Sequence, residues 1–251
     1  MRALALWLLL ALPVAAQDPA PVSGYDFLDA GTRALQDDDF LNPGFFAVER
    51  GAALWRQADG ATGQSCADCH GDGPEAMRGV AARYPLVDAQ TGALMNLELR
   101  INDERVRRLQ AEPLALDSDE MIALTAWLSF QSRGMPMQVT IDAAARPFFD
   151  RGRDYYFQRR GQLDLACTHC HDGLVGQKLR GDTISEGQIN GFPIYRILWR
   201  EMGSRHRMFE WCNTSLRAEP HAPGSPEYLE LELYLAWRGR GLPIEAPAVR
   251  R

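Results

Sequence analysis

Apart from its first sixteen residues, the 251-residue chain has no long hydrophobic run. Those residues, MRALALWLLLALPVAA, contain one basic residue, an apolar stretch and two alanines before Gln17. The stretch is shorter than the roughly 20 apolar residues that cross a bilayer, and its layout is typical of a cleaved secretory signal. We therefore expect residues 1–16 to be removed and the mature chain to be periplasmic, without a membrane span. An uncleaved membrane anchor is the alternative.

The chain also has no concentrated run of basic residues. Its 27 Lys and Arg residues are outnumbered by 33 Asp and Glu residues, which gives a formal net charge of −6. Domains that bind nucleic acid cluster Lys and Arg on one face, so we expect no nucleic acid among the partners. The length suits one large domain or two of about 100 to 120 residues.

Cysteine is scarce, and its spacing is unusual for an exported protein, in which cysteines normally pair as disulfides. Four of the five cysteines form two close pairs, and the fifth stands alone. In chain order they are Cys66, Cys69, Cys167, Cys170 and Cys212.

The two pairs lie in CADCH, residues 66–70, and CTHCH, residues 167–171, which both match the C-x-x-C-H pattern of c-type haem attachment. Two thiols at this spacing can each form a thioether with one haem, while the adjacent histidine binds the iron. We therefore expect two covalently bound haem c groups, with His70 and His171 as iron ligands. A redox dithiol or zinc is the alternative, although the wide separation of the pairs argues against one shared zinc site.

Both motifs belong to a longer internal repeat. Residues 51–70, GAALWRQADGATGQSCADCH, align without gaps on residues 152–171, GRDYYFQRRGQLDLACTHCH. Further along, LQAEP at 109–113 resembles LRAEP at 216–220. A repeat of this kind determines the architecture, so the chain is predicted to be two copies of one unit.

Helical periodicity dominates both copies. Apolar residues recur at helical spacing in residues 121–128 and 228–235, and no sustained alternation predicts a strand. A helix before the C-x-x-C-H motif and another near the end of the unit are typical of class I cytochrome c domains. We therefore expect an all-α fold of two tandem class I cytochrome c domains related by internal duplication, at residues 17–144 and 145–251.

The fifth cysteine, Cys212, follows the second motif in the span where small cytochromes c place the second axial ligand of the iron. A thiolate there would donate charge to the iron and favour a low reduction potential. A buried inert thiol is the alternative. In the first copy the aligned residue is Glu104 or Arg105, depending on where a one-residue gap falls, so that haem lacks the equivalent cysteine. Met95 or Met121 could supply sulfur instead.

Several longer motifs resemble the SoxA family, the cytochrome subunit of the periplasmic sulfur-oxidation complex SoxAX. The resemblance covers nearly the whole mature chain and is carried most specifically by the end of the second copy. The motifs are NLELRIN at 96–102, SRGMP at 132–136, GFPIYR at 191–196, CNTSLRAEP at 212–220 and LELYLAWRGRGLP at 231–243.

The resemblance implies an enzyme that couples thiosulfate oxidatively to a cysteine of the carrier protein SoxYZ. Two electrons would leave through the SoxX cytochrome subunit to a downstream small cytochrome c. His171 and Cys212 would bind the active-site iron, and Cys212 would also accept sulfur and carry it as a persulfide. The alternatives are a pure electron-transfer cytochrome and a thiosulfate dehydrogenase that forms tetrathionate.

The sequence departs from the family pattern in two places. The first haem lacks a distal cysteine near Glu104, which leaves its coordination open. Family members place an arginine one turn before the active cysteine to meet the anionic substrate, whereas Met208 stands there. Because an arginine fork suits a two-oxygen anion, we expect the neighbouring Arg207 to bind substrate, with Arg205 and Arg217 nearby.

Overall fold

The computed structural model describes residues 20–73 and 75–251. The expected signal segment, residues 1–16, lies outside the described residues. Among those described, no helix has both the length and the apolar character needed to cross a membrane.

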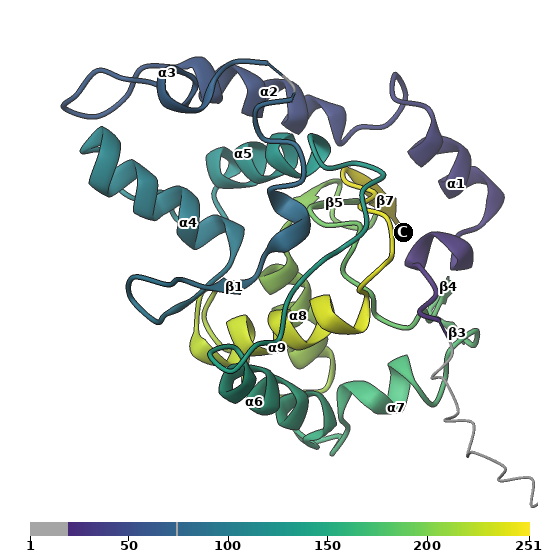
Figure 1. Cartoon of the computed structure of the whole chain (residues 1–251). Coiled ribbons are helices and arrows are strands. Elements are labelled where there is room, and N and C mark those ends of the chain that lie inside the picture. Colours follow the sequence, from purple (N-terminus) through teal and green to yellow (C-terminus); the bar gives the residue numbers. More distant parts are fainter. Residues whose placement is uncertain (1–19, 74) are drawn as a thin grey trace, which may run out of the picture.

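Two pairs of packed helices form the centre of the molecule. Helix α2 (Phe45–Arg56) packs on α5 (Asp119–Phe130), and α6 (Arg146–Phe157) packs on α9 (Pro226–Arg238). The α2–α5 pair lies in the upper part of Figure 1 and the α6–α9 pair in the lower part. The helices expected around residues 121–128 and 228–235 are thereby confirmed.

Each pair approaches closely at one glycine. A Cβ atom added to Gly51 would lie 2.1 Å from the carbonyl oxygen of Ala123, and one added to Gly152 would lie 1.9 Å from that of Glu230. No side chain fits at either distance, so the two glycines allow the helix backbones to touch. The residues share the same place in the two aligned sequences.

The remaining helices are short and connect or flank these pairs. They are η1 (Gly24–Phe27), α1 (Ala30–Asp37), α3 (Cys66–His70), η2 (Ala81–Arg83), α4 (Leu97–Glu104), the π-helical turn η3 (Arg105–Leu109), α7 (Cys167–His171) and α8 (Arg205–Ser215).

The expectation of an all-α fold is wrong in one respect, because the described chain also contains short strands. Strands β1 and β2 pair with each other, as do β3 and β4, and β5 lies between antiparallel β6 and parallel β7. Strands of two or three residues are too short to show alternation in the sequence. The strands are β1 (Leu86–Val87), β2 (Leu94–Met95), β3 (Lys178–Leu179), β4 (Asp182–Thr183), β5 (Ile194–Arg196), β6 (Glu201–Gly203) and β7 (Ala248–Arg250).

Equivalent segments of the two halves pair with each other. Residues 134–137 and 241–244 exchange backbone hydrogen bonds in matched pairs. Met137 N donates to Leu242 O at 2.9 Å, and Ile244 N donates to Met135 O at 2.8 Å. Because each bond has its counterpart from the other half, the contact has the reciprocal character of a two-fold interface.

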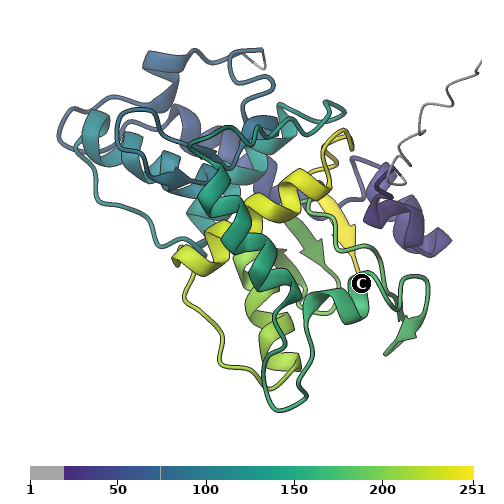
Figure 2. The same ribbon diagram turned by 60° about the horizontal axis from the view of Figure 1, so that its bottom comes forward.

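The segment before α2 lies against the second half of the chain. Asn42 donates to Pro247 O at 2.9 Å, and Gln36 accepts from Val249 N at 3.0 Å. Ser23 donates to Glu245. Figures 1 and 2 show α1 beside the C-terminal strand β7 in both views. The start of the described chain therefore packs on the half that contains the second motif.

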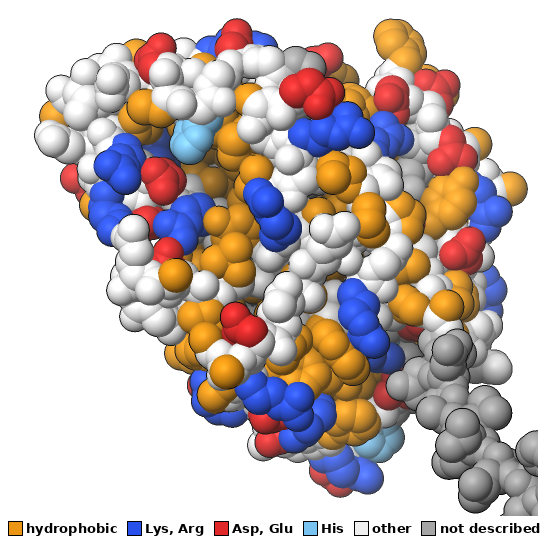
Figure 3. Space-filling view, viewed as in Figure 1, with side chains coloured by type: hydrophobic (Ala, Val, Ile, Leu, Met, Phe, Trp, Pro, Cys, Tyr) orange, Lys and Arg blue, Asp and Glu red, His pale blue; other side chains and the backbone are white. Residues whose placement is uncertain are grey.

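The surface carries charges of both signs without a single basic field on the face that Figure 3 shows. Arginine and acidic side chains alternate there, with apolar side chains between them. This distribution agrees with the slightly acidic composition of the chain.

We expect Gly51→Ala and Gly152→Ala each to lower the free energy of unfolding by about 1–3 kcal/mol, because the added methyl group meets a carbonyl oxygen. Denaturant unfolding of the haem-loaded protein, followed by circular dichroism, measures the change. Gly31→Ala on α1 is the control, since its added Cβ would contact only the Asp29 carboxylate at 3.3 Å. Equal stabilities of the three variants would contradict the close helix contacts.

Candidate functional site

The second C-x-x-C-H motif forms its own short helix, α7. Cys167 and Cys170 lie one turn apart, and both are free thiols. His169 is turned back on the helix start, where its Nδ1 accepts a hydrogen bond from Ala166 N at 3.0 Å. His171 is therefore the histidine of this motif that remains available as a ligand.

The His171 ring is oriented by a backbone carbonyl. Its Nδ1 donates to Ser185 O at 2.8 Å, since a carbonyl oxygen can only accept. Burial lowers the pKa of His171, which favours the neutral ring. This arrangement leaves Nε2 with a free lone pair, as in metal-binding histidines whose other nitrogen is held by a carbonyl.

An aromatic side chain holds the end of each motif helix from the preceding long helix. Trp55 Nε1 donates to Gly71 O at 3.0 Å, and Tyr156 OH donates to Asp172 Oδ1 at 2.8 Å. The sequence alignment pairs Trp55 with Tyr156. The two motifs are thus attached to α2 and α6 in the same way.

Cys212 projects from α8 toward the second motif. Burial is the main reason why the pKa of its thiol is raised to about 12; the neighbouring Cys167 also raises this pKa, whereas Arg196 lowers it. These electrostatic contributions place the sulfur near the first cysteine of the motif and near a guanidinium. A thiol with this pKa is neutral at pH 7, so its use as a thiolate requires a cation against the sulfur, such as iron.

Asn213 fixes the position of the helix turn that carries Cys212. Its side chain donates to Phe209 O at 2.8 Å and Tyr228 OH at 3.2 Å, and accepts from Tyr155 OH at 3.2 Å. The residue is buried. Sequence reasoning missed this role, because the three partners come from α6, α8 and α9.

The arginines near Cys212 are arranged differently from one another. Arg207 donates to Glu201 and, at 3.2 Å, to Met202 O, and its guanidinium lies 4.5 Å from the Trp199 ring. Arg205 is buried and pairs with carboxylates below α8. Arg217 is exposed and has a left-handed backbone (φ 54°).

A fourth arginine near Cys212 was not indicated by the sequence. Arg196 is buried beside Trp211.

The first motif forms helix α3. Ser65 and Asp68 cap the start of this helix reciprocally, and the Trp55 ring lies 5.7 Å from the His70 ring. Burial raises the pKa of Cys66, while the nearby Arg105 lowers it. His70 thus adjoins a buried tryptophan, and a guanidinium is near the first thiol.

The structure shows where the one-residue gap between the two halves falls. Counting from the helix N-caps Asn96 and Ser204 selects Glu104, whereas counting back from the left-handed residues Gln110 and Arg217 selects Arg105. The π-helical turn η3 lies between these two reference points and absorbs the extra residue of the first half. Both counts therefore hold, each on its own side of the turn.

Two acceptors hold the Arg105 guanidinium. Its Nη1 lies 2.8 Å from Asp59 Oδ2, and Nη2 donates to Glu112 O at 3.1 Å. Glu104 instead forms looser pairs with Arg100 and Arg108, at 3.9 and 3.8 Å. Arg105 also acts on the pKa of Cys66, the first cysteine of the first motif. Its position relative to that motif therefore corresponds to the position of Cys212 relative to the second motif.

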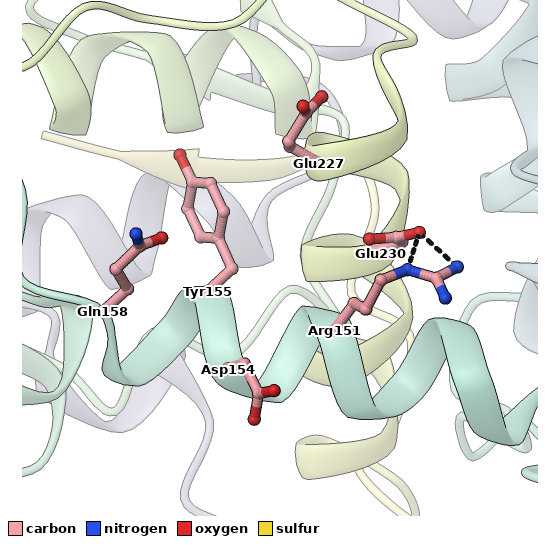
Figure 4. Close-up of a pocket in the computed structure, with 6 residues that line it drawn as sticks. All are labelled: Arg151, Asp154, Tyr155, Gln158, Glu227 and Glu230. Carbon is pink, nitrogen blue, oxygen red and sulfur yellow. Dashed lines mark hydrogen bonds and ion pairs between the residues drawn. The ribbon is translucent and has the colours of Figure 1, made fainter.

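A shallow depression of about 390 Å³ lies elsewhere, between α6 and α9 (Figure 4). Its lining includes Glu227 and the Arg151–Glu230 ion pair, in which Nε donates at 2.7 Å. Cysteine does not contribute to this lining, so the depression is separate from both motifs.

Comparison with known proteins identifies the relatives of this chain. A family model described as SoxA/TsdA, cytochrome c domain, matches residues 50–137. The L-cysteine S-thiosulfotransferase subunit SoxA of Pseudaminobacter salicylatoxidans is 42% identical over 92% of this chain and 81% of its own length. The chain belongs to the SoxA family. The SoxA subunit of Paracoccus pantotrophus is also 42% identical, over 91% of this chain and 78% of its own.

The SoxA fold is confirmed by a solved structure. A chain of the crystal structure of SoxXA from P. pantotrophus superposes with a TM-score of 0.88 at 42% identity, covering 91% of this chain and 86% of that one. The resemblance read from the sequence motifs is therefore confirmed.

The cytochrome c domain of SoxA implies covalently bound haem c, and the second motif fits such a group. Cys167 and Cys170 are free on one helical turn, and His171 presents a ring nitrogen with a free lone pair. Arg196 has a buried Nε without a hydrogen-bond partner among the described residues. A porphyrin with two carboxylates and an iron would use all of these groups.

A buried ion cluster anchors the start of the SoxA helix that carries Cys212. Arg205 lies 3.7 Å from Glu98 and 3.6 Å from Glu232, and His206 Nε2 lies 3.0 Å from Glu232. His206 Nδ1 accepts from Gly224 N at 2.9 Å, so Nε2 carries the proton. The cluster joins α4 of the first half to α8 and α9 of the second.

The two carboxylates of this cluster are held in different states. Burial, and then Glu232, raise the pKa of Glu98, whereas Arg205 and His206 overcome burial and lower the pKa of Glu232. Glu98 thus favours its neutral form in the folded protein. Glu232 is the carboxylate that balances Arg205.

We expect Glu98→Gln to gain stability relative to wild type as the pH rises above about 4.5. A carboxyl with a raised folded-state pKa opposes folding increasingly above its unfolded pKa, by up to about 1.4 kcal/mol per pH unit, and Gln removes this penalty. Chemical denaturation at several pH values measures the difference.

Glu232→Gln is the matched control with the opposite sign. Its carboxylate stabilises the fold at neutral pH and loses that effect on acidification, so the substitution should cost about 3–5 kcal/mol at pH 7. A large, pH-independent loss from Glu98→Gln would show instead that Glu98 is charged in the folded protein.

Proposed function

We propose that this chain catalyses the oxidative coupling of thiosulfate to a cysteine thiol of a carrier protein, at the second motif. The observation that carries the proposal is the half-buried position of Cys212 on α8, where Cys167 of the second motif and the Arg196 guanidinium both act on the pKa of its thiol. The relatives named L-cysteine S-thiosulfotransferase subunit SoxA support the substrate and the acceptor. By the same likeness, the carrier is the SoxYZ type.

In this proposal Cys212 is both an iron ligand and the first sulfur acceptor. Its thiolate bonds to the outer sulfur of thiosulfate and two electrons leave, which gives a Cys212–S–S–SO₃⁻ adduct. The carrier thiolate then attacks the outer sulfur, and Cys212 departs as a thiolate. Overall, a thiol and thiosulfate give an S-thiosulfonate, one proton and two electrons. Bound haem c supplies the route by which the electrons leave, one at a time.

The chain's own residues orient the reacting groups and neutralise the charge of the substrate. Ser185 O holds the His171 ring, Asn213 fixes the turn that bears Cys212, and Arg207 is the proposed substrate-binding residue on the outer side of Trp199. The planar guanidinium of Arg207 can bind both oxygens of a two-oxygen anion at once.

Electrons must pass to another protein, and a SoxX-type cytochrome subunit is the proposed partner. The likeness of this chain to a chain of the SoxXA complex of P. pantotrophus supports this assembly. A small cytochrome c would accept the electrons downstream. We propose the periplasm as the location, because the leading residues have the layout of a secretory signal.

We also propose two haem c groups on two domains related by duplication, with the boundary near residues 144 and 145. The matched hydrogen bonds at residues 134–137 and 241–244, together with the paired helix contacts at Gly51 and Gly152, support this origin. The first haem would be attached to Cys66 and Cys69, with His70 on the iron.

Cys212→Ala should lower the rate of thiosulfate coupling to the carrier thiol at least about a hundredfold, because the sulfur acceptor is lost. Haem attached through Cys167 and Cys170 should remain, as the pyridine haemochrome spectrum would show. Thr214→Ala, an exposed residue on the same helix, is the control. Mass spectrometry of Cys212 in wild type should detect added sulfur.

Other outcomes identify other functions. Unchanged coupling in Cys212→Ala would favour a pure electron-transfer cytochrome. Tetrathionate produced from thiosulfate alone, with no carrier present, would favour a thiosulfate dehydrogenase.

For the first haem, Arg105→Cys should create a thiolate ligand, whereas Glu104→Cys should not. The physical reason is that the Arg105 side chain pairs with Asp59 and acts on the pKa of Cys66, whereas the Glu104 side chain pairs with Arg100 and Arg108. Electron paramagnetic resonance of the ferric protein, in a Cys212→Ala background, detects a new low-spin thiolate signal. Such a signal in Glu104→Cys alone would refute this register.

A further inference from the structure

Arg196 is a buried arginine at the end of the central strand of the three-stranded sheet. It closes β5, pairs in register with Glu201 of β6 and Arg250 of β7, and is only 8% exposed. Its backbone is thus held from both sides. The guanidinium position is determined by the sheet rather than by a flexible loop.

The guanidinium of Arg196 has too few acceptors. Among the described residues its Nε is buried without a hydrogen-bond partner, and its ion pair with Asp182 Oδ2 is long, at 3.7 Å. Asp182 is shared with Arg251, at 3.8 Å. A buried donor without an acceptor is unfavourable, so the guanidinium can bind a further acceptor.

The surroundings of this guanidinium are aromatic and adjoin Cys212. It lies 4.7 Å from the ring of Trp211, the residue before Cys212, and 5.4 Å from the ring of Trp199. Arg207 covers the Trp199 ring as well, at 4.5 Å, but is itself paired with Glu201. Arg196 is therefore the less neutralised of the two cations around Trp199.

The first half of the chain shows how the same position can be neutralised. Counting from Tyr84 and Phe192, Asp88 corresponds to Arg196, and Arg100 corresponds to Met208. Asp88 and Arg100 form a partly buried ion pair. The second half carries an arginine at the strand position and an uncharged methionine on the helix, so the equivalent ion pair cannot form and a positive charge remains there.

We propose that Arg196 is an oxyanion-binding residue of the Cys212 pocket, taking over the task that an arginine at position 208 would perform. Its ligand is a group with two anionic oxygens: either the sulfonate end of thiosulfate, which rests on the proposed function, or a haem propionate. Both present the planar pair of oxygens that a guanidinium binds. The position of the guanidinium in the sheet keeps it ready for either group.

Arg196→Gln and Arg196→Lys in the haem-loaded protein test the proposal. Three quantities are measured: thiosulfate binding by equilibrium dialysis without carrier, KM and kcat with carrier, and the reduction potential of the second haem. Arg180→Gln, an exposed arginine on the same half, is the control. Thermal unfolding confirms that each variant is folded.

A substrate role predicts that Arg196→Gln weakens thiosulfate binding and raises KM by roughly ten- to a hundredfold. A propionate role predicts a lower potential, because the carboxylate loses its counter-charge and ferric iron is favoured, with thiosulfate binding unchanged. In both cases Arg196→Lys should keep part of the thiosulfate binding or of the haem potential that Arg196→Gln loses. A purely structural role would not predict this partial rescue.

Unchanged binding and unchanged potential in a folded Arg196→Gln protein would overturn the proposal. The proposed function fails separately: if Cys212→Ala keeps full coupling activity while Arg196→Gln still alters binding or potential, the oxyanion site stands and the sulfur-acceptor role does not.

Discussion

The backbone contact between α6 and α9 at Gly152 is the constraint on which the position of Cys212 depends. Because no side chain separates the two helices there, α9 is fixed against the helix that leads into the second motif. Helix α9 in turn supplies Tyr228 to Asn213 and Glu232 to Arg205, at the two ends of α8. Cys212 is carried between these two anchors, so its position beside the motif follows from how closely α6 and α9 pack.

The two halves share this frame but differ in the charges placed on it. At the position of Cys212 the first half has Arg105, held by Asp59 and Glu112 O. A thiolate and a guanidinium act on an adjacent iron in opposite directions, the first favouring the ferric state and the second the ferrous state. If each motif holds a haem, as proposed, the two centres would differ in electronic character, and the proposed nucleophilic thiol would stand at the second.

Much of this was readable from local sequence. The four long helices and the family followed from short motifs and helical periodicity, since these features depend on residues close together in the chain. The short strands were not predicted, because β5 and β7 pair only after the C-terminal end has crossed the molecule. The preference for Arg105 over Glu104 also required the structure, because it depends on which side chain lies near the first motif, and Arg105 is the one that acts on the pKa of Cys66.

The sequence by itself determined that the chain holds two C-x-x-C-H motifs and a single further cysteine, because those residues carry their chemistry wherever the chain places them. Only the tertiary structure decided which arginine near that cysteine has the fewer acceptors to balance its charge. Arg207 is nearer in sequence, but Glu201 pairs with it, whereas Arg196 is brought to Trp211 by a strand from an earlier segment and finds no close acceptor for its Nε among the described residues. Charge at a buried site depends on which partners surround each group in space, and chain order does not record that.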